Sequence, residues 1–349
     1  MTDTQSTKSV QALFRPFTVG NLSLSNRIVM APMTRQFSPD GVPGDHVAAY
    51  YRRRAENGVG LIVTEGTVIN HPDASNQPNV PYIYGEAALK GWAHVVSEVH
   101  QVGGKIIPQI WHMGARGQVN DYTEAEIAEL VQQFAHSAAA AKEAGFDGIE
   151  LHGAHEYLID QFFWAKTNTR TDRYGGDAVG RTRFAVEVIE ACRAAVGPDF
   201  PIVFRFSQWK GSDYSAKLVE TPEELASFLQ PLVDAGVDVF HCSTRRFWQP
   251  EFEGSDLNLA GWTKKLTGKP TITVGSVGLD GEFMTLFKEG KGAGVSGIDG
   301  LIERLEQGEF DLVAIGRALL ADPAWADKVQ QGRQDELIAF SPEILKELY

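Results

Sequence analysis

The 349-residue sequence predicts a single (β/α)8 barrel, and three observations lead to this fold class. Short apolar runs alternate with helical patterns eight times along the chain. Several of these runs, such as LIVTE and IVFRF, are largely apolar, as expected for strands buried on both faces of a parallel sheet. No linker-like or low-complexity segment divides the chain, so we expect one domain over residues 1–349.

Each predicted strand is followed by a predicted helix. Two helix starts carry a chemical signal: Thr123 with Glu126 forms a capping box, and Thr221 caps a helix that begins with Pro222. The predicted strands span residues 27–31, 59–65, 105–110, 148–152, 201–206, 237–242, 271–274 and 312–315. The predicted helices span residues 45–57, 86–102, 124–144, 181–195, 222–235, 260–266, 281–288 and 323–330.

The main alternative fold is a doubly wound sheet. That fold predicts a glycine-rich turn directly after the first strand, whereas this chain reads Ala31-Pro32-Met33-Thr34 there. A GxGxxG pattern does occur at 292–297, but the stretch before it, FKEGK, is not a strand. We therefore predict the barrel, and we interpret residues 292–297 as a flexible surface insertion.

Composition and charge limit the partners that the protein can have. The formal charge is −13, from 32 basic and 45 acidic residues, which argues against non-specific binding to nucleic acid or to an anionic membrane. No segment approaches the roughly 20 apolar residues of a membrane span, and the start, MTDTQSTKSV, lacks the apolar stretch of a secretory signal. Cys192 and Cys242 cannot form a disulfide framework and fit a reducing cytosol. We expect a cytoplasmic monomer or homodimer that acts on a small molecule.

Polar residues and glycines are concentrated just past the predicted strands. In barrels of this kind the chemistry lies where the strands reach the C-terminal face. Core packing alone does not explain these residues, because an isolated buried glutamine or arginine costs several kcal/mol unless a partner satisfies it. Together they indicate a ring around a polar, planar ligand. The residues are Thr34, Gly66, Gln109, His152, His155, Tyr157, Arg205, Gly275, Ser276, Gly316 and Arg317.

Two glycine-bearing loops follow the seventh and eighth strands, which is the usual phosphate-binding place in this fold. They read TVGSVG at 273–278 and AIGRALL at 314–320. Glycines let backbone N–H groups approach an anion, and Arg317 adds a charged fork. For either loop alone a simpler explanation is available, in which glycine only turns the chain. Both loops together, in this order, favour a phosphate site.

The segment LHGAHEYLIDQF, just past the fourth strand, is the sharpest signal in the sequence. His152 and His155 are three residues apart, so they can face the same side of a turn. One interpretation is a metal pair, although a helical zinc pair normally has the spacing HExxH. A second is two hydrogen-bonded structural histidines. A third is two imidazole N–H donors that hold a carbonyl oxygen and stabilise the enolate formed from it, with Tyr157 as a proton donor that stays protonated at neutral pH.

Over most of its length the chain resembles the Old Yellow Enzyme family of FMN-dependent ene-reductases. The motifs that carry this resemblance are long, and they occur in the right order on the predicted strands. They are FRPFTVGNLSLSNRIVMAPMTR (14–35), GLIVTEGT (60–67), PQIWHMG (108–114), ELHGAHEYLIDQF (150–162), NTRTDRYGG (168–176) and DLVAIGRALLADP (311–323).

The resemblance implies where FMN would contact the first half of the chain. Pro32, Met33 and Thr34 would line the flavin, with Thr34 forming a hydrogen bond near O4 and tuning its potential. Gly66 and Gln109 would contact the pyrimidine edge of the flavin.

The resemblance also implies the remaining roles. Arg205 would lie near N1 and O2 and stabilise the negative charge of the reduced flavin, while His152 and His155 would bind the substrate oxygen and Tyr157 would protonate the α-carbon. NAD(P)H would reduce FMN and leave, and hydride would then pass to the β-carbon of an enone or nitro compound in a trans addition. The phosphate would be held by Gly275, Ser276, Gly316 and Arg317.

Three loops depart from the family pattern. After the third strand, relatives insert a long lid segment with a β-hairpin, whereas only residues 113–122 remain here. After the fifth strand, FRFSQWK (204–210) differs from the usual sequence. After the sixth strand comes TRRFWQPEF (244–252). In this loop we expect Phe247 and Trp248 to wall the substrate pocket or to bind nicotinamide, with simple loop packing as the alternative.

Two other functions fit the same residues. One is a barrel flavoprotein that uses its FMN differently, as a dehydrogenase or a nitroester reductase. The other is a non-catalytic barrel that binds a phosphate-bearing ligand, which would not show the yellow colour of a flavoprotein.

Overall fold

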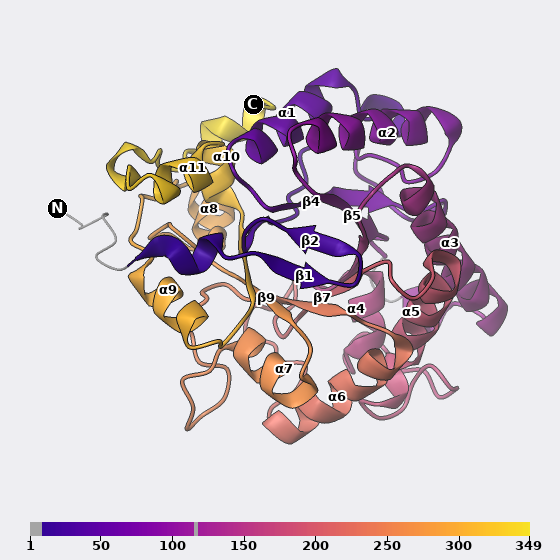
Figure 1. The fold of residues 1–349 in the computed structure, drawn as a ribbon. Coiled ribbons are helices and arrows are strands. Elements are labelled where there is room, and N and C mark those ends of the chain that lie inside the picture. Colours follow the sequence, from indigo (N-terminus) through magenta and orange to yellow (C-terminus); the bar gives the residue numbers. More distant parts are fainter. Residues whose placement is uncertain (1–8, 115–117) are drawn as a thin grey trace.

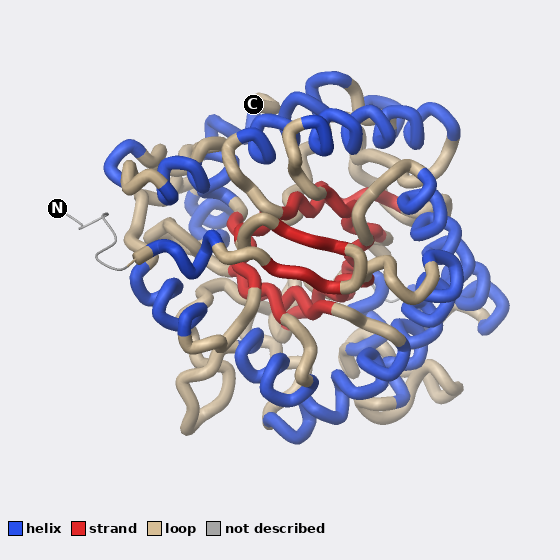
Figure 2. The backbone as a smooth tube through the Cα atoms, viewed as in Figure 1, coloured by secondary structure: helices blue, strands red, loops and turns tan. Residues whose placement is uncertain are grey.

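Eight parallel strands close into a barrel in the computed structural model, which describes residues 9–114 and 118–349. The strand order around the barrel is β10-β3-β4-β5-β6-β7-β8-β9. Figure 2 shows this ring of strands inside a ring of helices, and the predicted (β/α)8 fold is confirmed. The strands are β3 (Ile28–Met30), β4 (Leu61–Val68), β5 (Ile106–Trp111), β6 (Ile149–Gly153), β7 (Ile202–Ser207), β8 (Val239–Ser243), β9 (Thr271–Val274) and β10 (Leu312–Ile315).

All eight predicted strands are present, and their ends differ from the prediction by a few residues at most. Almost every residue in them is buried, because the inner face lines the barrel and the outer face is covered by helices. This double burial is why the sequence reads as apolar runs instead of alternating patterns.

The helices pack outside the barrel, as Figure 1 shows, and the eight predicted helices are confirmed. The Thr123–Glu126 capping box is present, and Thr221 caps the helix that begins at Pro222. The short α4, α9 and α10 were not predicted. The helices are α1 (Asp45–Glu56), α2 (Glu86–Gln101), α3 (Glu124–Glu143), α4 (Leu158–Phe163), α5 (Arg183–Val196), α6 (Pro222–Ala235), α7 (Leu259–Thr267), α8 (Phe283–Glu289), α9 (Asp299–Glu306), α10 (Arg317–Ala321) and α11 (Trp325–Gln330), with 3-10 turns η1 (Val10–Phe14), η2 (Pro39–Gly41), η3 (Gln118–Asn120), η4 (Gly180–Thr182), η5 (Gln334–Glu336) and η6 (Pro342–Lys346).

An antiparallel hairpin that the sequence did not predict closes one end of the barrel. It consists of β1 (Phe17–Val19) and β2 (Leu22–Leu24), and it crosses the near end of the barrel in Figure 1. Its turn contacts the loop that leads into β7, because the Asn21 N–H donates to the Asp199 carbonyl. The closed end is therefore the N-terminal end of the strands, opposite the predicted site.

The inner face of the barrel changes from apolar to polar along the strands. Near the hairpin, Ile107, Val203 and Val239 lie in one buried cluster with Leu22 and Leu24. Two residues further along β5, β7 and β8, the inward positions are polar and buried: Gln109, Arg205 and His241. Alternate residues of a strand point to the same face. The apolar core of the barrel and the polar residues of the candidate site are therefore adjacent layers on the inner face of the same strands.

The segment between β5 and α3 is short, as expected from the sequence. It contains η3, and residues 115–117 within the predicted 113–122 segment lie outside the described residues. The GxGxxG stretch at 292–297 follows no strand of the barrel, which confirms that it is not a dinucleotide-binding motif. The stretch lies at the surface, where Gly292 and Gly297 are exposed, but it is anchored to the C-terminal segment, because Ala293 is buried and exchanges two backbone hydrogen bonds with Phe340.

Candidate active site

The carboxyl ends of β5 to β8 bring the central predicted residues together. Gln109 lies opposite Glu150 in the register of β5 and β6, and His152 lies opposite Arg205 in that of β6 and β7. Arg205 in turn lies opposite His241 of β8. The polar residues at the ends of these four strands therefore lie next to one another and form one continuous group.

A buried carboxylate connects the floor of this group. Gln109 Nε2 donates a hydrogen bond of 2.9 Å to one oxygen of Glu150, and His241 Nδ1 lies 2.7 Å from the other. Because Nε2 of Gln109 is engaged with Glu150, the amide oxygen is the group that Gln109 can offer to a ligand N–H. Glu150 and His241 were not among the predicted site residues.

Arg205 is a buried cation with few partners. It is only 7% exposed, and its Nη2 donates a long hydrogen bond of 3.4 Å to Ser243 Oγ. Its Nε has no hydrogen-bond partner among the described residues. An arginine buried in this way is costly unless its charge is balanced. Its guanidinium is thus suited to an anionic ligand group.

His152 is a neutral hydrogen-bond donor. Burial, with the positive charge of Arg205, lowers the pKa of His152 well below its ordinary value. Its Nδ1 accepts a hydrogen bond of 3.4 Å from the Ala154 N–H, so the ring proton lies on Nε2. The ring meets those of Tyr157 and His155 edge to face, with centroid distances of 4.8 Å and 5.2 Å.

His155 lies beside His152, but its ring nitrogens are used differently. Its Nε2 lies 2.7 Å from Ser243 Oγ, so this nitrogen is engaged within the protein. The sequence predicted that His152 and His155 would each offer an N–H to one oxygen. For His155, Nδ1 is the ring nitrogen that is left for a ligand, because Nε2 is engaged with Ser243. Burial also lowers the pKa of His155 well below its ordinary value, and Arg205 is the second cause.

Tyr157 packs against the ring of Trp111 at a centroid distance of 5.0 Å. Burial raises the pKa of Tyr157 above its ordinary value, which keeps the phenol protonated at neutral pH. Its hydroxyl has no hydrogen-bond partner in the described part of the chain, so its proton is free to serve a ligand.

The turn that carries His155 is held by several contacts, because it adopts an unusual backbone. His155 and Glu156 both have positive φ angles, of 63° and 68°. Residues other than glycine rarely adopt such angles. The His155 N–H donates to Ser207 Oγ, and the Glu156 N–H donates to Asp160. Asp160 also forms a fully buried ion pair with Lys210, from the loop after β7. These contacts fix the turn in the one arrangement that places the histidine ring.

The two predicted phosphate loops lie side by side, since β9 and β10 are paired. Gly275 has a φ of +139°, and a Cβ there would lie 2.8 Å from the backbone of Arg245 and Arg246, so this position requires glycine. Ser276 has a positive φ, and its hydroxyl donates to the Arg245 carbonyl. The loop after β9 is thus drawn tightly against the loop after β8.

Arg317 connects the loop after β10 with the loop after β9. It follows Gly316 at the start of α10, and its guanidinium donates hydrogen bonds of 2.6 Å and 3.2 Å to the carbonyls of Gly281 and Glu282. The carboxylate of Glu282 pairs with Arg246. Cationic side chains therefore gather at the predicted phosphate position, although the Arg317 donors also stabilise the loop itself.

Residues 32–34 follow β3, whereas Gly66, which the sequence predicted just past its strand, lies within β4. Thr34 is exposed and Pro32 and Met33 are half-buried. Met33 also lies next to the second phosphate loop, since a Cβ on Gly316 would be 3.4 Å from its sulfur. At Gly66 a Cβ would lie 2.6 Å from the indole of Trp111, so this glycine allows the close packing of that ring.

The two aromatic residues after β8 differ in exposure. Phe247 is buried in the main core, whereas Trp248 is 43% exposed and meets Phe247 edge to face. Trp248 is thus the one of the two that is exposed at the surface.

Sequence analysis missed four polar or aromatic residues of the site: Glu150, Trp209, His241 and Ser243. Three of them follow from the period of two along a strand, since Glu150 precedes His152 by two residues, and His241 and Ser243 extend the inward series of β8. Trp209 has no such signal, because it lies in a loop.

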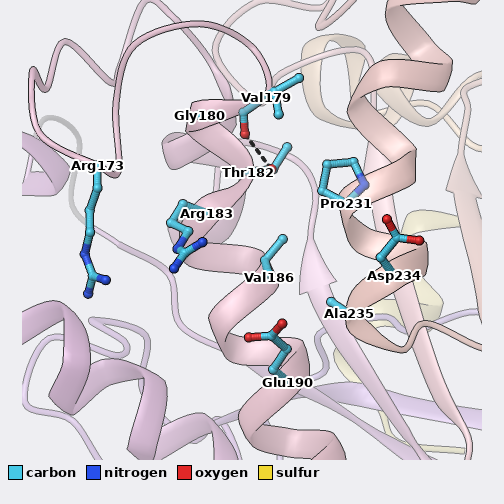
Figure 3. Close-up of a pocket in the computed structure, with 10 residues that line it drawn as sticks. All are labelled: Arg173, Val179, Gly180, Thr182, Arg183, Val186, Glu190, Pro231, Asp234 and Ala235. Carbon is cyan, nitrogen blue, oxygen red and sulfur yellow. Dashed lines mark hydrogen bonds between the residues drawn. The ribbon is translucent and has the colours of Figure 1, made fainter.

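A cavity of about 570 Å³ elsewhere on the surface contains none of the predicted residues. Figure 3 shows it between η4, α5 and α6, lined by side chains such as Arg183, Glu190 and Asp234. It lies among the outer helices and away from the strand ends, so it is not the candidate active site.

Comparison with known proteins identifies the family. The sequence model of the NADH:flavin oxidoreductase / NADH oxidase family matches residues 12–125 and 118–296. This chain belongs to that family. The two matched ranges overlap at the short segment between β5 and α3, where the predicted lid is reduced.

Several relatives of this NADH:flavin oxidoreductase family protein are known. The NADH oxidase of Thermoanaerobacter brockii is 36% identical over 93% of this chain, and 12-oxophytodienoate reductase 2 of Arabidopsis thaliana is 32% identical over 89% of it. The match covers 86% of the plant protein but 52% of the oxidase, so this chain spans about half the length of that relative. Within the described residues, no helix has the length and apolarity to cross a membrane.

Solved structures show the same fold. Morphinone reductase in complex with tetrahydroNAD has a TM-score of 0.78 at 28% identity, covering 95% of this chain and 93% of that one. Old Yellow Enzyme from Pichia sp. AKU4542 has a TM-score of 0.77 at 25% identity, covering 96% and 90%. The resemblance to the Old Yellow Enzyme family is therefore confirmed.

Membership of this family implies FMN as the cofactor, and the residues present fit it. Arg205 is a buried cation whose Nε lacks a partner among the described residues, as an anionic ring edge requires. The Gln109 amide is held by Glu150, and among the described residues nothing donates to its side-chain oxygen, which suits a ring N–H. Gly275 allows the close backbone approach that a phosphate site needs.

Proposed function

We propose that this protein is an FMN-dependent ene-reductase. NAD(P)H is the hydride source, an α,β-unsaturated carbonyl or nitro compound is the acceptor, and the two bind in turn. When bound, FMN supplies the hydride chemistry that amino-acid side chains lack. Tyr157 protonates the α-carbon and completes a trans addition.

The observation that carries this proposal is the grouping of Tyr157, His152 and Arg205 at the ends of β6 and β7. The Tyr157 phenol is protonated and its hydroxyl has no competing partner among the described residues. His152 offers Nε2–H to a substrate oxygen, because its Nδ1 already accepts a hydrogen bond. An acid beside an oxygen-binding donor is the arrangement that protonation next to a carbonyl requires.

The remaining predicted residues would hold the cofactor. Pro32, Met33 and Thr34 would line the flavin, Gly66 and Gln109 its pyrimidine edge, and the Arg205 guanidinium the anionic edge. The phosphate would lie at the two paired loops, held by Gly275, Ser276, Gly316 and Arg317. Trp248 would contact the substrate from the mouth, with Phe247 supporting it from the core.

Replacing Tyr157 with phenylalanine tests the proposal. The change removes one hydroxyl and keeps the ring packing against Trp111, so enone reduction should slow by on the order of 100-fold or more. Reduction of the flavin by NAD(P)H should continue at nearly the wild-type rate. The two half-reactions are measured separately by stopped-flow absorption.

The matched control is Tyr349→Phe, the same chemical change at an exposed residue near the C-terminus. Its enone reduction should equal that of the wild type. If Tyr157→Phe reduced enones at the wild-type rate, Tyr157 would not be the proton donor. If only an acceptor that needs no proton were turned over by the wild type, the nitroester reductase or dehydrogenase alternative would replace the proposal.

A further inference from the structure

Ser243, at the end of β8, lies between two residues of the site. It is 2% exposed, and its Oγ is 2.7 Å from Nε2 of His155. Arg205 Nη2 donates a hydrogen bond of 3.4 Å to the same oxygen. The serine hydroxyl therefore links the buried guanidinium to the histidine ring.

The direction of these hydrogen bonds follows from a count of protons. A guanidinium only donates, so Ser243 Oγ is an acceptor towards Arg205. The hydroxyl proton of Ser243 then needs an acceptor of its own, because a buried donor without one costs roughly 1–3 kcal/mol. Among the described residues, His155 Nε2 is the acceptor within reach. Nε2 is thus the unprotonated nitrogen.

Trp209 holds the same histidine from its face. The indole stacks on the His155 ring at a centroid distance of 4.3 Å and an interplanar angle of 18°. Its Nε1–H donates a hydrogen bond of 3.2 Å to the Ser243 carbonyl. Ser243 therefore anchors both the edge of the histidine, through its hydroxyl, and the ring stacked on it, through its backbone.

His155 is neutral, so its ring carries a single proton, which lies on either Nδ1 or Nε2. Burial and the nearby Arg205 keep the pKa of His155 far below neutral, so the ring carries one N–H. Nδ1 forms no hydrogen bond with any other described residue.

We infer that Ser243 is a positioning residue that keeps the proton of His155 on Nδ1, so that His155 donates to the substrate oxygen from Nδ1 while His152 donates from Nε2. This inference rests on the proposed function in one respect, namely that His155 contacts the substrate. The position of the proton is a property of the protein itself.

The test is nitrogen-15 NMR of the FMN-loaded protein with labelled histidine, with the His155 signals assigned by their loss in His155→Gln. Nδ1–H is expected in the wild type. Ser243→Ala removes the hydroxyl donor, so a shift towards Nε2–H is expected. Ser243→Thr retains a hydroxyl and should restore the wild-type form, and Ser227→Ala, at an exposed serine of α6, should leave it unchanged.

Two results would overturn the inference: Nε2–H in the wild type, or an unchanged proton position in a folded Ser243→Ala protein. Ser243→Ala should also lower kcat/KM for the enone about tenfold, the worth of one hydrogen bond, with flavin reduction by NAD(P)H nearly unchanged. If the proton moved but enone turnover did not, Ser243 would be confirmed as the positioning residue, and the substrate role of His155 would be contradicted.

Discussion

His152 and His155 show how residues three apart in one motif take different chemical states. The Nδ1 of His152 accepts from a backbone N–H two residues along, whereas the Nε2 of His155 meets a serine from another strand. Both rings are buried near Arg205, and burial lowers the pKa of each. The two rings are therefore neutral donors that hold their proton on opposite nitrogens.

Glu65 is a second buried ionisable residue close to the site. Its carboxylate accepts hydrogen bonds from the backbone N–H groups of Arg35 and Gln36, which follow Thr34. Burial raises the pKa of Glu65 from an ordinary value of 4.5 to about 7. Glu65 thus fixes the start of the loop that would line the flavin, in a form that is protonated below neutral pH.

This raised pKa predicts a pH-dependent contribution to stability. Between pH 4.5 and about 7 the folded protein binds a proton at Glu65 that the unfolded chain does not, so the free energy of unfolding falls as pH rises through this range. The contribution is fully present below pH 4.5 and lost above about 7, and amounts to on the order of 3 kcal/mol. Glu65→Gln should remove this slope, as measured by denaturant unfolding across the range.

The control for this change is Glu129→Gln, at an exposed position of α3. Its unfolding free energy should follow the wild-type pH dependence. Parallel curves for the wild type and Glu65→Gln would show that Glu65 titrates normally in the folded protein.

At the scale of elements, the barrel strands could be predicted and the hairpin could not. Eight apolar runs with helices between them define the barrel, because burial on both faces leaves a clear pattern in each run. β1 and β2 have three residues each, too few for a periodic pattern to stand out. Their role depends on where the chain folds back, and no local pattern encodes that.

The candidate site shows the same limit. Residues at strand ends, such as Gln109 and Arg205, could be found because a barrel places all strand ends on one face. The contact of Ser243 with His155 joins residues 88 positions apart, and a serine after a strand is common. Its importance becomes visible only when the two side chains meet in the structure.

The hairpin should contribute to stability without entering the chemistry. Leu22 is buried in the apolar cluster at the hairpin end of the barrel, together with residues of β5, β7 and β8. Leu22→Ala leaves a cavity there and should lower the free energy of unfolding by about 2–5 kcal/mol. Denaturant unfolding measures this loss, and the enone rate of the folded protein should stay within about twofold of the wild type.

Ser23→Ala provides the comparison, since Ser23 lies on the same hairpin and is exposed. It should change the unfolding free energy by no more than about 0.5 kcal/mol. A loss of similar size in both variants would indicate that the hairpin does not pack on the barrel core.

At the scale of the whole molecule, the barrel separates stability from chemistry. The hairpin and the apolar cluster occupy one end, and the polar residues occupy the other, two residues further along the same strands. The chain has a net charge of −13, yet the candidate site places Arg205, Arg246 and Arg317 near where an anion would bind. These local cations would favour an anion at this end of the barrel, although the protein as a whole is acidic.

The central claim is that these residues hold FMN and use it for hydride transfer from NAD(P)H to an activated double bond. The most direct test is the visible absorption spectrum of the purified protein during an anaerobic titration with NADH or NADPH, followed by an enone. The account predicts the absorption band of oxidised flavin, its loss on addition of the nicotinamide, and its return on addition of the enone. A colourless protein that binds no FMN when FMN is supplied, or a bound flavin that neither nicotinamide bleaches, would contradict it.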